Sequence, residues 1–137
     1  MLPKEAFLSH ASADSETAEK IAGTLRRHGV PIWYSPSDIL GAQQWHDEIG
    51  NALARCDWFL LVLTPAAVAS VWVKRELVYA LNDPRYSRIL PMLIETCEAE
   101  RLSWVLPSFQ MIDFRSDFDR GCRQLLRTWG LGYSPPS

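Results

Sequence analysis

Short apolar runs recur along the chain, separated by longer stretches in which apolar residues return with helical spacing. The run WFLLVL is continuously apolar rather than alternating, which is typical of a strand covered on both faces of a parallel sheet. Pro91 interrupts a similar run, and because proline cannot donate to a sheet we expect a bulge or an early strand start there. Strands are predicted at Ala6–Leu8, Val30–Tyr34, Trp58–Leu63, Ile89–Ile94 and Phe109–Phe114.

The stretches between these runs predict amphipathic helices. In the first, Asp14 or Ser15 can cap the start and Gly29 follows the end. The third begins after Thr64, because proline is tolerated in a first helical turn. Segment 96–106 permits no assignment. Helices are predicted at Asp14–His28, Trp45–Cys56, from Pro65 to about Asn82, and Asp117–Trp129.

Strand and helix alternate often enough to predict right-handed βαβ units and an open parallel sheet. A chain of 137 residues suits one such domain. We place the domain at residues 1–131. Residues 132–137, with two prolines, are predicted to be a disordered tail or the start of a linker to a partner domain.

Composition and charge exclude several classes of protein. The chain is 47% hydrophobic with a net charge of −2, so it gives no electrostatic reason to bind nucleic acid or an anionic membrane. Its three cysteines are too few and too scattered for a disulfide framework, and its histidines lack metal-ligand spacing. The first residues lack the apolar stretch of a signal peptide. We therefore predict a cytoplasmic protein.

In open parallel sheets, ligands bind beyond the carboxyl ends of the strands. No phosphate-binding loop of the type GxxxxGK[ST] or GxGxxG follows a strand, and no aspartate of a phospho-accepting receiver follows the third. Ser9 and His10 are neighbours, but successive strand residues point to opposite faces, so they do not make a nucleophile pair.

Glu76 is the acidic residue whose helical neighbours make it the best candidate for a catalytic carboxylate. Its helical neighbours at three and four residues are Trp72, Val73, Tyr79 and Ala80, none of which is a cation. Such surroundings favour desolvation and a raised pKa. From the residues alone, a catalytic role and a structural role remain equally open.

Four segments, in order, resemble a Toll/interleukin-1 receptor (TIR) domain of the bacterial type: FLSHAS, DILGAQQW, WFLLVLTP and SVWVKRE. The resemblance extends from Ala6 to Trp129. It implies a flavodoxin-like, doubly wound, five-stranded parallel sheet with helices on both faces.

Many TIR domains cleave NAD+ between nicotinamide and ribose, using a glutamate on the third helix with a tryptophan one turn earlier. The resemblance assigns catalysis to Glu76. Ala11 and Ser12 stand where the family often has basic residues, so backbone amides are expected to contact phosphate instead. The implied substrate-binding residues are Ser9, His10, Ser12, Asp38, Gly41, Trp45, Ser70 and Trp72.

One carboxylate suffices for this chemistry, because nicotinamide leaves as a neutral molecule and needs no general acid, unlike an ordinary alcohol leaving group. Glu76 would stabilise the developing oxocarbenium ion and hold the ribose hydroxyls. Trp72 or Trp45 can attract the cationic pyridinium. Water then gives ADP-ribose and internal attack a cyclic isomer; the sequence leaves this choice open. NAD+ is a substrate here, and no cofactor or metal is expected.

The resemblance also implies partners. It suggests an effector of bacterial anti-phage immunity that is activated by self-association into a homo-oligomer or filament, with the loop after the second strand against a neighbouring protomer, and with a sensor domain or partner protein. A non-enzymatic TIR adaptor, in which Glu76 is dispensable, is the alternative. A third hypothesis, another flavodoxin-like enzyme acting on nucleosides, would need Asp38 as a second acid.

Overall fold

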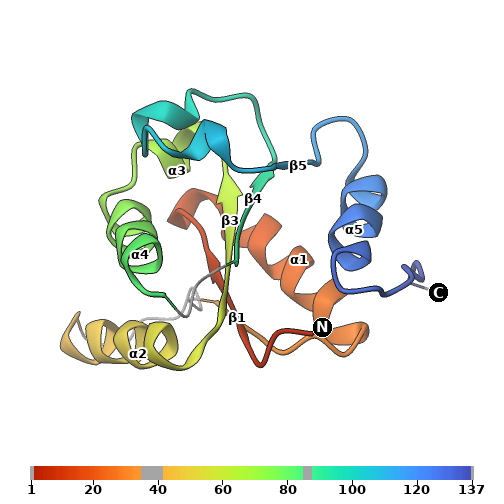
Figure 1. The fold of residues 1–137 in the computed structure, drawn as a ribbon, viewed down its shortest axis with the longest axis horizontal. Helices are drawn as coiled ribbons and strands as arrows, with labels where there is room; N and C mark the ends of the chain where they lie inside the picture. Colours follow the sequence, from red (N-terminus) through yellow and green to blue (C-terminus); the bar gives the residue numbers. More distant parts are fainter. Residues whose placement is uncertain (1, 35–41, 85–87, 137) are drawn as a thin grey trace.

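The computed structural model describes residues 2–34, 42–84 and 88–136, with the backbone alone for residues 42–45. Its sheet has five parallel strands in the order β2-β1-β3-β4-β5 (Figure 1), which is the doubly wound, flavodoxin-like order expected from the sequence. The strands are β1 (Ala6–Ser9), β2 (Ile32–Tyr34), β3 (Trp58–Leu63), β4 (Arg88–Leu93) and β5 (Ile112–Asp113).

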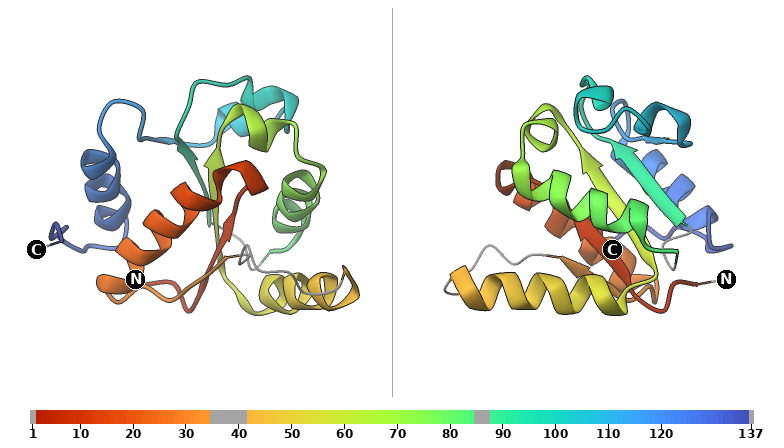
Figure 2. Two further views of the ribbon diagram at one scale, coloured as in Figure 1. Left: turned by 180° about the vertical axis from the view of Figure 1, so that it is seen from behind. Right: turned by 60° about the vertical axis from the view of Figure 1, so that its left-hand side comes forward.

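Helices cover both faces of this sheet (Figure 1 and Figure 2). Helices α1 (Ser15–Arg27) and α5 (Phe118–Arg127) pack on one face. The other face carries α2 (Ala42–Arg55), α3 (Pro65–Val68) and α4 (Val71–Asn82). Short 3-10 turns complete the fold: η1 (Ser12–Asp14), η2 (Ala99–Arg101) and η3 (Leu106–Ser108).

The two hydrophobic layers follow from strand alternation. Phe7 points toward α4 and stacks on Phe59 with ring centroids 5.7 Å apart, whereas Leu8 and Leu60 point to the layer of α1 and α5. The apolar run of β3 is buried from its second residue onward, which confirms that it is covered on both faces. Because Phe7 is buried on the side of α4, the next residue of β1 on the same face, Ser9, also points toward α4.

The structure differs from prediction at the third helix, which is interrupted after Val68. The Thr64 hydroxyl accepts from the Ala67 amide at 3.1 Å and caps α3. The Ser70 hydroxyl then accepts from the Val73 amide at 3.2 Å and caps a second helix, α4. Two hydroxyl caps therefore divide the predicted helix in two.

Of the two expectations for Pro91, the bulge was wrong, whereas β4 does start at Arg88, one residue before the predicted strand. The register between β3 and β4 is continuous and pairs Pro91 with Leu61. The Ile94 amide donates a hydrogen bond to the Leu63 carbonyl at the end of β3. Because successive backbone amides of a strand point to opposite neighbours, the Pro91 nitrogen, three residues earlier, points toward β5. Because β5 pairs only with Met92 and Leu93, no ladder hydrogen bond is lost at Pro91.

The predicted fifth strand is shorter in the structure, where β5 holds only two residues. The predicted tail also makes contacts: the Ser134 amide donates to His28 Nε2 at 2.9 Å, and Tyr133 stacks on the His28 ring. At least these two residues therefore pack on the domain. The boundary at residue 131 stays a prediction. Across residues 2–34, 42–84 and 88–136, no helix combines the length and apolar character needed to cross a bilayer.

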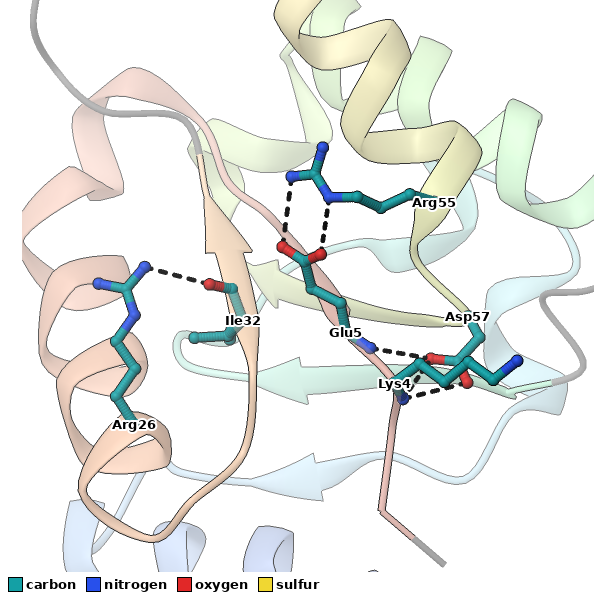
Figure 3. A network of polar contacts seen from close by, with 6 residues as sticks. All are labelled: Lys4, Glu5, Arg26, Ile32, Arg55 and Asp57. Carbon is teal, nitrogen blue, oxygen red and sulfur yellow. Dashed lines mark hydrogen bonds and ion pairs between the residues drawn. The ribbon is translucent and has the colours of Figure 1, made fainter.

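A polar network closes the amino end of the sheet (Figure 3). Asp57 accepts hydrogen bonds from the backbone amides of Lys4 and Glu5, at 3.1 to 3.4 Å. Arg55 donates two hydrogen bonds to the Glu5 carboxylate, from Nε at 2.7 Å and from Nη2 at 3.3 Å. These contacts join the segment before β1 to the end of α2 and the start of β3.

Candidate active site

The strand order reverses between β1 and β3, and the carboxyl ends of these two strands form the topological switch point at which such sheets bind ligands. Ser9 ends β1 and Thr64 directly follows β3. Both side chains are 1% exposed. Ser9 shares the face of Phe7, so its hydroxyl is directed toward α4 rather than toward α1.

Glu76 on α4 meets Ser9 at this point. The Ser9 hydroxyl donates to Glu76 Oε1 at 2.7 Å, although the two residues are 67 positions apart. Glu76 is only 6% exposed, on the face of α4 that carries Val73 and Leu77 into the core. Within the described residues, no cation forms an ion pair with it.

Burial raises the pKa of Glu76 from 4.5 to about 7, and the Ser9 hydroxyl opposes part of that rise. The direction agrees with physical expectation, because desolvation disfavours the charged form and a donated hydrogen bond favours it. The desolvated carboxyl predicted from the helical neighbours of Glu76 is therefore present. Near neutral pH it exchanges between its ionised and neutral forms.

Trp72 lies one turn before Glu76 and is 46% exposed, so it does not pack flat onto the sheet. The Arg75 guanidinium lies 5.2 Å from the centroid of its ring. The ring of His46, on α2, lies 6.5 Å from the same indole in a tilted arrangement. An aromatic side chain thus stands exposed beside the buried carboxyl. Sequence reasoning missed both neighbours, although the three-residue spacing of Arg75 was a usable signal.

The other predicted site residues are spread around this edge. His10 is half-buried, with Nδ1 2.9 Å from the Ala11 carbonyl oxygen and its ring 6.2 Å from that of Tyr34. Ser12 is exposed at the start of η1, and Ser70 caps α4. Asp38 and Gly41 lie outside the described residues, as does the side chain of Trp45.

Asp14 plays a part that the sequence did not indicate. It occupies the N-cap position of α1, but its side chain makes no cap hydrogen bond. Instead, the Thr64 hydroxyl donates to Asp14 Oδ2 at 2.5 Å. This bond ties the turn after β1 to the turn after β3, on the two sides of the switch point.

Fold and site together define a flavodoxin-like α/β domain with a buried carboxyl at its switch point. Among known families, the model of the TIR domain matches residues 6–126. The chain therefore belongs to the TIR domain family, as its sequence motifs suggested.

Individual relatives agree with this membership. An NAD(+) hydrolase of Paracoccus denitrificans, PdTIR, is 29% identical over 93 residues, which is 66% of this chain and 31% of that protein. A stimulator of interferon genes protein of Magallana gigas is 26% identical over 117 residues, or 82% of this chain and 28% of that protein. The chain thus spans about a third of the length of these relatives.

Solved structures share the fold. The TIR domain of the Toll-related receptor TRR-2 from Hydra magnipapillata superposes with a TM-score of 0.73 at 19% identity, covering 90% of this chain and 95% of that one. The TIR domains of the activated Roq1 resistosome, which recognises the pathogen effector XopQ, give a TM-score of 0.68 at 14% identity, covering 91% and 98%.

Proposed function

We propose that this TIR domain is an NAD+ nucleosidase that cleaves the bond between nicotinamide and ribose. The observation that carries the proposal is Glu76: a buried carboxyl at the switch point, without a cation partner among the described residues. Desolvating a carboxylate without a compensating charge costs free energy, so such groups are concentrated at functional sites. The Paracoccus relative, itself named an NAD(+) hydrolase, adds support.

The chemistry suits a single carboxyl group. When the glycosidic bond breaks, its electron pair leaves with nicotinamide, which becomes neutral, and positive charge develops on the ribose. Ionised Glu76 stabilises that charge electrostatically, an effect that is strongest where water is excluded. Water attacks the ribosyl cation and releases a proton to give ADP-ribose. Attack by the adenine or its ribose gives a cyclic ADP-ribose isomer instead.

Trp72 contributes to substrate binding in this proposal. Its exposed indole can attract the pyridinium ring of NAD+ by a cation–π contact. We propose His10 and Ser12, which follow β1, and Ser70, which caps α4, as further substrate-binding residues. Asp38, Gly41, Trp45 and Ser9 are the other members of the set proposed from the sequence.

Release of nicotinamide from NAD+ tests the proposal directly. The wild type is compared at high protein concentration with Glu76→Gln, and with Glu19→Gln as a control, because Glu19 is exposed on α1, against the opposite face of the sheet. We expect turnover in the wild type and control, and a loss of about 10²–10³-fold in Glu76→Gln. Equal turnover in all three proteins would remove Glu76 from the mechanism.

The proposed setting is bacterial anti-phage immunity, in the cytoplasm, with activation by self-association and a sensor domain or partner protein. The greater length of the curated relatives and the assembled state of the Roq1 TIR domains support this part. Self-association predicts that turnover per molecule rises with protein concentration. Turnover per molecule that stays constant over a wide dilution series would contradict it.

A TIR adaptor without catalytic activity is the second candidate. The exposed apolar side chains of Val71 and Val78, on the outer side of α4, favour it because they suit a protein interface. It predicts assembly without nicotinamide release, and assembly that is unchanged by Glu76→Gln.

A further inference from the structure

We propose that Ser9 is a positioning residue of this active site: its buried hydroxyl holds one oxygen of the Glu76 carboxylate and leaves the other for the substrate. The proposal rests on the proposed function and deepens it. It also assigns Ser9 a different role from the substrate contact that the sequence suggested.

Burial separates Ser9 from the substrate. At 1% exposure its hydroxyl has almost no surface that a ligand could reach, whereas Ser12, three residues later, is exposed. A serine hydroxyl has a single proton to donate, and in this structure Glu76 Oε1 accepts it at 2.7 Å. While that bond is made, Ser9 cannot donate to a ribose or a phosphate. Its influence on the reaction therefore passes through Glu76.

The strand and helix that carry the pair make it rigid. Ser9 is the last residue of β1 and pairs with Leu61 of β3, and β2 flanks β1 on its other side. Glu76 lies in the middle of α4, between the buried residues Val73 and Leu77. Among the described residues, Ser9 supplies the only hydrogen bond to the side chain of Glu76. Without that bond, the carboxyl group would keep its burial but lose the contact that selects its orientation.

The bond also favours the reactive form of Glu76. An ionised carboxylate only accepts hydrogen bonds, so a donor aimed at it stabilises the charged state. Titratable groups on surrounding elements include Lys74, Arg75 and Tyr79 on α4, His10 after β1, Asp14 in η1, and His46, Asp47 and Glu48 on α2. The two influences on the pKa of Glu76 that the structure resolves are burial, which raises it, and Ser9, which lowers it.

The test is the pH dependence of kcat and of kcat/KM between pH 5 and 9 for the wild type, Ser9→Ala, Ser9→Thr and the control Ser116→Ala, at an exposed serine after the edge strand β5. In Ser9→Ala we expect the acid limb to move up by about one pH unit, a tenfold loss on the acid side that recovers as the pH rises. Ser9→Thr keeps a hydroxyl donor and restores the wild-type limb. Ser116→Ala leaves the limb in place.

Different results would overturn the proposal. A higher KM with an unmoved acid limb would mean that Ser9 contacts the substrate directly. An equal loss at every pH, without rescue by Ser9→Thr, would mean that Ser9 serves folding alone.

A second measurement needs no turnover. The carboxyl carbon of Glu76 is followed by 13C NMR against pH and is assigned by its disappearance in Glu76→Gln. In Ser9→Ala, the pKa of Glu76 obtained from this titration is expected to rise by about one unit. Ser9→Thr keeps the hydroxyl donor and should keep the wild-type pKa. If NAD+ is not cleaved but this titration still moves, the proposed function fails and the pairing stands. A titration that stays in place refutes the pairing, whatever the activity.

Discussion

Two glutamates at opposite ends of β1 are held in opposite ways. Glu5, just before the strand, is partly exposed and receives two hydrogen bonds from the Arg55 guanidinium (Figure 3). Glu76 lies beside the last residue of the strand and is almost completely buried, and its carboxylate accepts a hydrogen bond from the neutral hydroxyl of Ser9. A cation offsets the charge of Glu5, while that of Glu76 is offset only in part.

The amino end of the sheet joins chain segments, whereas the carboxyl end is where we propose that the chemistry takes place. At the amino end, the carboxylates of Glu5 and Asp57 join chain segments through cations and backbone amides. At the carboxyl end, Glu76 is desolvated at the switch point, where open parallel sheets bind their ligands. Uncompensated burial destabilises the fold, and a developing positive charge on a substrate would supply the missing compensation.

The burial of Glu76 should make the free energy of unfolding depend strongly on pH, which is the largest of the expected effects. The folded-state pKa of Glu76, about 7, lies above its ordinary value of 4.5, so the folded protein binds the extra proton between these values. The free energy of unfolding should therefore fall as pH rises through that window, by about 3 kcal/mol from this group.

Urea unfolding of the wild type and of Glu76→Gln at several pH values between 4 and 8.5 measures the effect. The difference in free energy of unfolding between them should change by about 3 kcal/mol in favour of the glutamine variant toward high pH. Glu5→Gln is the control and should differ from the wild type by no more than about 0.2–1 kcal/mol, the contribution of an exposed ion pair. Parallel curves for the wild type and Glu76→Gln would mean that Glu76 is not desolvated and does not differ from Glu5 in this respect.

Much of this arrangement could be predicted from the sequence. The run WFLLVL matched β3 residue for residue, because a strand buried on both faces needs no polar alternation. The desolvation of Glu76 followed from neighbours three and four residues away on one helix. Both inferences depend only on local spacing.

What the sequence could not predict depends on distant contacts. The pairing of Ser9 with Glu76 spans 67 residues, and that of Asp14 with Thr64 spans 50. Each depends on which strand lies beside which, and no local period encodes that. The break before Ser70 was missed because apolar residues on both sides continue one helical pattern, while the break itself depends on hydroxyl caps.

A second prediction concerns the exposed side of the Glu76 site. Trp72→Ala should raise KM for NAD+ by about 2–30-fold, which corresponds to a cation–π contact of about 0.5–2 kcal/mol. Because Arg75 lies over its ring, we expect the substrate to take the other face of the indole. The KM of Trp72→Phe should fall between that of the wild type and that of Trp72→Ala.

Steady-state kinetics of nicotinamide release measures this effect. The control is Trp104→Ala, an exposed tryptophan between η2 and η3, away from the turns after β1 and β3 in the sequence. A KM that Trp72→Ala leaves unchanged would assign the indole to assembly rather than to substrate binding.

The smallest expected effect belongs to the amino end. Glu5→Gln removes the charge that Arg55 pairs with, but both side chains are partly open to water. Solvent screens such a pair, so the loss in free energy of unfolding should be about 0.2–1 kcal/mol and should shrink in 1 M salt. Chemical unfolding at low and high salt measures it, with Arg55→Gln and the double variant completing a mutant cycle.

Nicotinamide release should not change in any of the three. A coupling energy far above this range, or a loss of turnover, would mean that the two ends of β1 are not separate in function, because a change in the amino-end network would then reach Glu76 along the strand.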